Sequence, residues 1–260
     1  MSKHWKTGLF VMVLSGIFAA SAWAVPTRLT VRTLAHDAKF IGSVVGGMKV
    51  VVKDYYTEQV LASGMIMGAT GDTKLLMTQP VTRGMVRSKG KATAKAVFEF
   101  DIDDPLKLLV EVIGPMGAEA DIHKEVKTTW LLPGQDIAGD GLLFEMTGLI
   151  VHPHNPEAHE FFPLGATLPI TAVVTPMCGC PIQADSPLWN ARDYTVKATI
   201  YKGSKIIAEL PLKYADKTSN FGTSFTPKEA GGYRVIFTAH DKRNNQGVGI
   251  SGFVVAAPKK

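Results

Sequence analysis

The feature that most constrains the fold is an alternation of polar and apolar residues that recurs along the chain after residue 24. It is clear over residues 28–34 and again over residues 91–101. Side chains of a β-strand point alternately to opposite faces, so this pattern predicts strands with one face in a core. Apolar residues at helical spacing are not sustained in this part of the sequence. We therefore expect an all-β protein.

Glycine, proline and aspartate separate the predicted strands at short intervals. The expected strands cover residues 28–34, 48–53, 58–62, 91–101, 106–113, 141–151, 170–174, 194–201, 205–214, 220–226, 232–239 and 249–255. Many short strands bounded by turn residues are typical of β-sandwiches. The fold that we expect is two β-sandwich modules.

The first 24 residues have the order of a secretory signal peptide. Lys3 and Lys6 precede an apolar run over residues 8–20, and Ala22-Trp23-Ala24 has the small residues of a cleavage site. The run is shorter than the about 20 apolar residues that span a bilayer. We expect cleavage after Ala24 and a soluble, periplasmic or secreted mature protein without a membrane span.

Charge and motifs argue against two classes of function. The formal net charge of +5 falls by two when the leader lysines are removed, and the remaining charges are scattered. No cluster of Lys and Arg alternates with aromatic residues, so we expect no nucleic-acid partner. The sequence lacks G-x-S-x-G, H-E-x-x-H and phosphate-loop motifs, so we expect no enzyme.

The second half of the chain carries a tyrosine motif. Tyr233 follows a pair of glycines, and Val235 lies two positions later. The motif resembles the tyrosine corner of immunoglobulin-like domains, in which the phenol hydroxyl bonds to nearby backbone. Together with residues 225–227 and 239–241, it resembles bacterial immunoglobulin-like modules. The resemblance implies an immunoglobulin-like β-sandwich over residues 170–257, and it implies nothing about a ligand.

The first half resembles another sandwich family. A Gly46-Gly47 break precedes a strand that ends at Asp54, and residues 57–62 return after a polar turn. This pattern resembles carboxypeptidase-regulatory-like modules, which implies a β-sandwich over residues 25–152.

The segment between the two expected modules is rich in proline. Its prolines predict a stiff and extended linker over residues 153–169.

The stretch at residues 175–181 is the most specific chemical signal. It contains Met177 and the two cysteines of the chain, Cys178 and Cys180. Thioether and thiolate ligands select Cu(I), and side chains two apart in an extended chain share a face. His152 and His154 offer imidazole ligands. The first interpretation is a periplasmic copper-handling protein with these five residues as metal ligands and Cu(I) as the ion.

Three other interpretations of the cysteine pair remain open, and none of them implies a cofactor. The pair can form a static disulfide, which oxidising compartments favour. The protein is then a structural or adhesion scaffold with a protein or glycan partner. The pair can also serve thiol–disulfide redox chemistry, although the C-x-x-C of thioredoxin-like enzymes is absent. The last interpretation is a turn without a chemical role.

Overall fold

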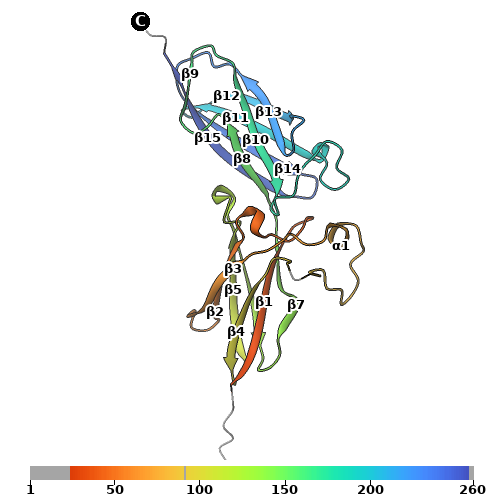
Figure 1. Cartoon of the computed structure of the whole chain (residues 1–260). Helices are drawn as coiled ribbons and strands as arrows, with labels where there is room; N and C mark the ends of the chain where they lie inside the picture. The colour runs from red at the N-terminus through yellow and green to blue at the C-terminus, as the bar shows by residue number, and fades with distance from the viewer. Residues whose placement is uncertain (1–23, 91, 258–260) are drawn as a thin grey trace, which may run out of the picture.

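The computed structural model describes residues 24–90 and 92–257. Except for Ala24, the predicted signal peptide lies outside these residues. The described chain is almost entirely β, and its strands form two sandwich modules arranged end to end (Figure 1). The predicted fold class, all-β with two β-sandwich modules, is confirmed.

The N-terminal module has a three-stranded and a four-stranded sheet. The orders are β4-β1-β7, with β1 parallel to β7, and β3-β2-β5-β6, with all neighbours antiparallel. Buried side chains from both sheets, such as Leu29 and Val110, form the core. The strands are β1 (Val25–Ala35), β2 (Met48–Asp54), β3 (Val60–Ile66), β4 (Ala96–Ile102), β5 (Leu106–Gly114), β6 (His123–Leu131) and β7 (Ile137–Met146).

Short helical segments connect some of these strands. The α-helix α1 begins after Asp72, whose carboxylate accepts a hydrogen bond from the Leu75 N–H at 2.7 Å. This is the N-cap arrangement that satisfies a free backbone donor. The segments are α1 (Thr73–Met77) and the 3-10 helices η1 (Ser43–Val45) and η2 (Glu119–Asp121).

The C-terminal module has the strand order β8-β10-β13-β12-β11-β14-β15-β9. Strand β12 pairs with β13 only through Lys213 and Tyr214, so the order folds into two layers at this point. The bounds are β8 (Leu149–Asn155), β9 (Glu160–Pro163), β10 (Leu168–Pro176), β11 (Tyr194–Lys202), β12 (Lys205–Tyr214), β13 (Asn220–Phe225), β14 (Gly231–Asp241) and β15 (Gln246–Ala256), with the 3-10 helix η3 (Ala191–Asp193) before β11.

The structure differs from the prediction of a linker over residues 153–169. Strand β8 pairs with β10 and includes Pro153, while β9 pairs with β15 and ends at Pro163. Both strands lie at ends of the sheet order, where proline is tolerated because one edge needs no ladder partner. The modules therefore meet at residues 147 and 148, and the single strand expected over residues 141–151 is divided between β7 and β8.

The β14–β15 loop holds the two modules together through Asn245. The Gly148 N–H donates to Asn245 Oδ1 at 3.0 Å, and Asn245 Nδ2 donates to the His36 carbonyl at 3.4 Å. Next to it, Arg243 Nε lies 2.7 Å from Asp37 Oδ2. Only 2% of Asn245 is exposed. A buried amide that bonds groups of both modules is costly to remove, because its partners lose their hydrogen bonds.

We expect Asn245→Ala to lower the free energy of unfolding by about 1–3 kcal/mol, the cost of leaving buried polar groups unsatisfied. Urea unfolding followed by circular dichroism measures the change. Gln246→Ala, at an exposed neighbouring position, is the matched control. Equal stability of the two variants would contradict this role of Asn245.

Candidate functional site

The sulfur residues lie in the turn after β10, at the junction between the modules. We call residues 177–180 the sulfur turn. Met177 and Cys178 have no exposed surface, and Cys180 is almost fully buried. A disulfide joins Cys178 to Cys180, and the Gly179 N–H donates to the Pro176 carbonyl at 2.8 Å. The sulfurs therefore belong to a closed turn inside the protein.

The sulfur turn packs against η1 of the N-terminal module. Gly179 has a φ of +71°, and a Cβ at this position would lie 2.8 Å from Val45 Cγ1 and 3.0 Å from Val44 Cγ1. Glycine suits both the left-handed backbone and the close approach. The disulfide thus closes a turn that forms part of the contact between modules.

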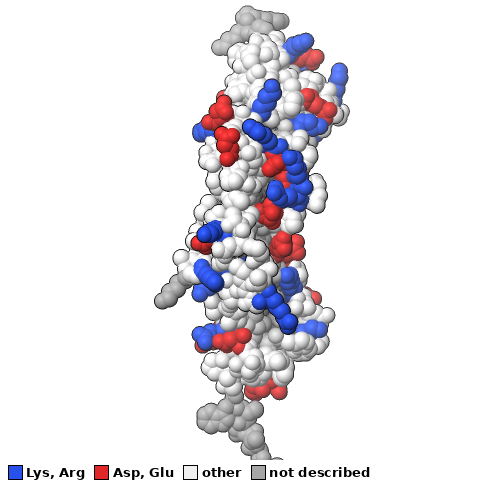
Figure 2. All heavy atoms as spheres, turned by 90° about the vertical axis from the view of Figure 1, so that its right-hand side faces the viewer, with Lys and Arg blue, Asp and Glu red and all other residues white. Residues whose placement is uncertain are grey.

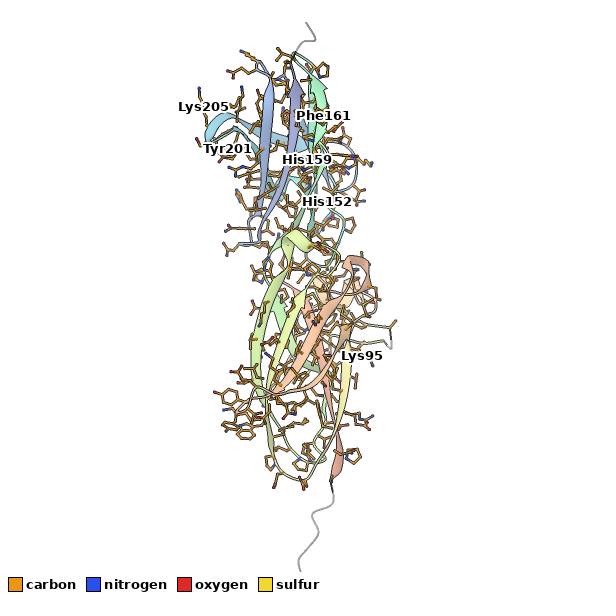
Figure 3. The ribbon with its side chains drawn as sticks, turned by 90° about the vertical axis from the view of Figure 1, so that its left-hand side faces the viewer. Lys95, His152, His159, Phe161, Tyr201 and Lys205 are labelled. Atoms are coloured by element: carbon orange, nitrogen blue, oxygen red, sulfur yellow. A yellow bond between two sulfur atoms is a disulfide. The ribbon has the colours of Figure 1, made fainter. Side chains whose placement is uncertain are left out.

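The predicted histidine ligands lie away from the sulfur turn. His152 and His154 are exposed on β8, and His152 faces Val173 across the ladder with β10. Val173 precedes Met177 by four residues, which corresponds to about 13 Å along a strand. Figure 3 shows His152 on the C-terminal module. The structure brings Met177, Cys178 and Cys180 together but does not bring these histidines to them.

A different histidine approaches Met177. A Cβ built on Gly148 would lie 3.0 Å from His123 Cε1 and 3.4 Å from Met177 Sδ. Sequence reasoning missed this neighbour, because His123 comes from β6, far away in the sequence.

The fit of a Cu(I) ion to these residues is poor in this arrangement. The disulfide leaves neither cysteine with a thiolate, the form that binds a metal. Among residues 24–90 and 92–257, no group of three or more His, Cys, Asp or Glu side chains is arranged to hold a metal ion. Copper binding through Met177, Cys178, Cys180, His152 and His154 stays a prediction.

A buried carboxyl group lies at the same junction. Asp121, in η2, is 6% exposed, and its Oδ2 accepts a hydrogen bond from the Val151 N–H at 3.1 Å. Burial raises the pKa of Asp121 to about 6, and the hydrogen bond from Val151 opposes this rise. Burial outweighs the hydrogen bond because a single donor does not replace the water that a carboxylate loses. The sequence around Asp121 contains no motif that indicates a buried carboxyl group.

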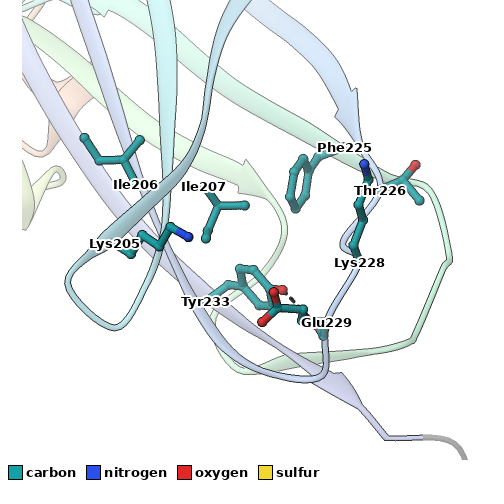
Figure 4. A pocket seen from close by; sticks show the side chains of 8 residues that line it. All are labelled: Lys205, Ile206, Ile207, Phe225, Thr226, Lys228, Glu229 and Tyr233. Atoms are coloured by element: carbon teal, nitrogen blue, oxygen red, sulfur yellow. Dashed lines mark hydrogen bonds between the residues drawn. The ribbon is translucent and has the colours of Figure 1, made fainter.

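The tyrosine corner of the C-terminal module is confirmed. The Tyr233 hydroxyl donates to the Glu229 carbonyl at 2.8 Å (Figure 4). Val235, two positions later, is fully buried. Tyr233 also lines a shallow depression of about 300 Å³, together with Ile207, Phe225 and the side chain of Lys205. The lining also includes Thr226, Lys228 and Glu229, and the Glu229 carboxylate pairs with Lys202, which is not part of the lining.

A second surface feature lies at the far end of the N-terminal module. The Lys107 ammonium lies 4.0 Å from the ring centre of Tyr55, 5.7 Å from Tyr56 and 5.6 Å from Trp130. The three rings are 38%, 70% and 50% exposed. We call these four residues the aromatic tip. Sequence reasoning missed it because the ring-bearing segments are distant in the chain.

Comparison with known proteins gives only distant similarities. No protein-family model matches the sequence, and no match is found among curated proteins. Similar solved structures include an engineered protein (16% identity, 46% of this chain and 22% of that chain, TM-score 0.33), the fibronectin(III)-like modules of Clostridium thermocellum CbhA (12%, 86% and 88%, 0.30) and the chicken interferon gamma receptor alpha chain (11%, 89% and 98%, 0.31). The chain therefore spans about a fifth of the engineered protein's length. These similarities are too low to support an argument about function.

We expect the stability contributed by Asp121 to be largest below pH 4 and to decline as the pH rises towards 6. The folded state holds the proton more tightly, because the pKa rises from 3.8 to about 6 on folding. The full difference corresponds to at most about 3 kcal/mol.

Asp121→Asn keeps an acceptor for Val151 and removes the titration. Urea unfolding from pH 4 to pH 7 should therefore show the variant gaining stability relative to the wild type as the pH rises. A constant difference between the two proteins over this range would contradict the assignment.

We expect the double variant Cys178→Ser and Cys180→Ser to unfold with a free energy lower by about 1–2 kcal/mol, because the closed loop is short. Alkylation of the native protein without reductant should label no thiol, and labelling after reduction and denaturation should find two. A free thiol in the native protein, or an unchanged thermal melt of the variant, would contradict the disulfide as a structural brace.

Proposed function

We propose that this chain is an exported, non-catalytic binding scaffold in which the Cys178–Cys180 disulfide is a static brace. One observation carries the proposal: the disulfide-closed sulfur turn is buried and packs against Val44 and Val45 of the other module. A thiol that exchanges or transfers a metal needs solvent access and a stable thiolate. Burial at a contact between modules supports a packing role instead.

The contacts at the junction support a scaffold that holds its two modules in a fixed relative orientation and presents a binding surface to a partner. A connection of residues 147 and 148 joins β7 to β8, and the contacts of Asn245 and Arg243 limit rotation about it. The expected partner is a protein or a glycan in the periplasm or at the cell surface. The carboxypeptidase-regulatory-like resemblance of the N-terminal module belongs to this proposal, and the β2–β3 hairpin that turns at Asp54 supports it.

Two observations support export. The N-terminal sequence has the charge, apolar run and A-x-A order of a signal peptide. A disulfide persists in oxidising compartments and is rare in the cytosol.

Within residues 24–90 and 92–257, no helix has the length and apolar character needed to cross a membrane.

Copper handling is the alternative, and one contact favours it. Met177 Sδ and the His123 ring lie against the same glycine, Gly148, which brings a thioether close to an imidazole. Binding would also require reduction of the disulfide and release of the sulfur turn from Val44 and Val45. Thiol–disulfide exchange would require the same release.

A Cu(I) titration against a chromophoric chelator separates the two functions. The scaffold proposal predicts that mature protein, as isolated and after mild reduction without denaturant, does not compete for Cu(I). The double Cys→Ser variant should behave in the same way. One tight site that is present in the reduced wild type and lost in the variant would establish the copper alternative and refute the static brace.

A further inference from the structure

All tyrosine and tryptophan residues of the N-terminal module lie in one exposed place. Between residues 25 and 148 the sequence contains only Tyr55, Tyr56 and Trp130 of these types. All three are at least 38% exposed, and Tyr56 is 70% exposed. Large amphipathic rings that are left out of the core and gathered at one site are typical of binding surfaces.

The topology brings these rings and Lys107 together from β2, β5 and β6. Tyr55 and Tyr56 follow the end of β2, and the Tyr55 N–H donates to the Lys107 carbonyl of β5 at 2.9 Å. Trp130, near the end of β6, faces Lys107 across the β5–β6 ladder. The two tyrosine rings meet edge to face at 5.1 Å. Lys107 therefore lies among three rings whose outer surfaces face solvent.

The turn that carries the tyrosines is held in place before any ligand arrives. Asp54 Oδ1 accepts hydrogen bonds from the N–H groups of Tyr56 at 2.9 Å and Thr57 at 2.7 Å, and from the Thr57 hydroxyl at 2.9 Å. The bonds from Thr57 lower the pKa of Asp54, so the carboxylate stays charged. A preorganised turn loses less conformational entropy on binding.

The charge around the aromatic tip is negative. Asp101, near the end of β4, and Asp103 and Asp104, in the exposed β4–β5 turn, lie at the same end of the module as Asp54 and Glu58. Lys53 and Lys107 are the nearby cations, and Lys53 is paired with Glu111. Figure 2 shows acidic side chains at the lowest described part of the molecule, with basic side chains just above them. Anionic lipids and acidic polymers are therefore repelled.

The combination of rings, hydroxyl groups and net negative charge fits an uncharged polysaccharide. A sugar ring has an apolar C–H face that stacks on an aromatic ring, and a rim of hydroxyl groups that bond to polar groups beside it. Tyr and Trp provide both, since each has a flat apolar body and a polar edge. A standard protein interface needs about 800 Å² on each partner, whereas a sugar chain needs only a few ring-sized contacts.

We infer that the aromatic tip binds a neutral polysaccharide, with sugar rings stacked on Tyr56 and Trp130. The inference rests on the proposed scaffold function and names the class of its partner. The Tyr hydroxyls, the Trp130 indole N–H and the Lys107 ammonium bond to sugar hydroxyls beside the stacked rings. The tip lies where β2 ends and β5 begins, at the opposite end of β5 and β6 from the residues near the module junction.

Native affinity electrophoresis tests this inference with the full mature protein. The neutral probes are hydroxyethyl cellulose, galactomannan, xylan and dextran, and the comparison probes are alginate and vesicles of phosphatidylcholine with phosphatidylglycerol. We expect retardation by at least one neutral polysaccharide. The Tyr56→Ala and Trp130→Ala double variant should weaken it at least tenfold. Tyr56→Ala alone, at a position that is 70% exposed, should weaken it severalfold without affecting the fold.

Phe161→Ala is the matched control. Phe161 is 71% exposed on β9 of the C-terminal module, so it is an equally exposed ring at a different site (Figure 3). This variant should keep full retardation. The inference is overturned if no neutral polysaccharide retards the wild type, if the Tyr56 and Trp130 variants bind as well as the control, or if only the anionic vesicles bind. Any of these results would refute polysaccharide binding alone. The scaffold function is tested separately by the Cu(I) titration and would be refuted by a tight Cu(I) site.

Discussion

The packing of the sulfur turn against η1 is the contact on which the rest of the structure depends. Gly179 approaches Val44 and Val45 so closely that a side chain at this position would collide with them. The disulfide keeps the turn closed, and Asn245 and Asp121 add polar contacts at the same level of the molecule. Residues 147 and 148 form the whole connection between β7 and β8. The modules are therefore joined by this short connection and by the packed contacts beside it.

This junction accounts for the division of roles in the molecule. Residues that look reactive in the sequence, Met177, Cys178 and Cys180, are buried and pack the two modules together. The residues best suited to contact a partner, Tyr56 and Trp130, lie exposed at the far end of the N-terminal module. A buried disulfide and an exposed aromatic tip together favour a scaffold that presents a binding surface over a protein that exchanges thiols or metal ions.

Alternation of side chains predicted most strands because one face of each is buried. It missed β6, which is an edge strand with mostly exposed residues. Lys127, opposite the buried Val110, is itself exposed and donates to the Leu143 carbonyl, so this strand carries no apolar signal. The linker prediction was wrong because Pro153 and Pro163 lie on edge strands, where a missing N–H costs little. The tyrosine corner was predictable because its contact is local. The contact of Met177 with His123 and the aromatic tip could not be predicted from the sequence, because both depend on contacts between strands that are distant in the chain.

The most direct test of the account is the tumbling of the two modules in solution, measured by ¹⁵N relaxation of the mature protein with its disulfide intact. If the sulfur turn and Asn245 fix the junction, amides of both modules will fit one anisotropic rotational diffusion tensor with a shared long axis. Two separate tensors, each with the short correlation time of a single sandwich, would contradict a packed junction and the brace role of the disulfide.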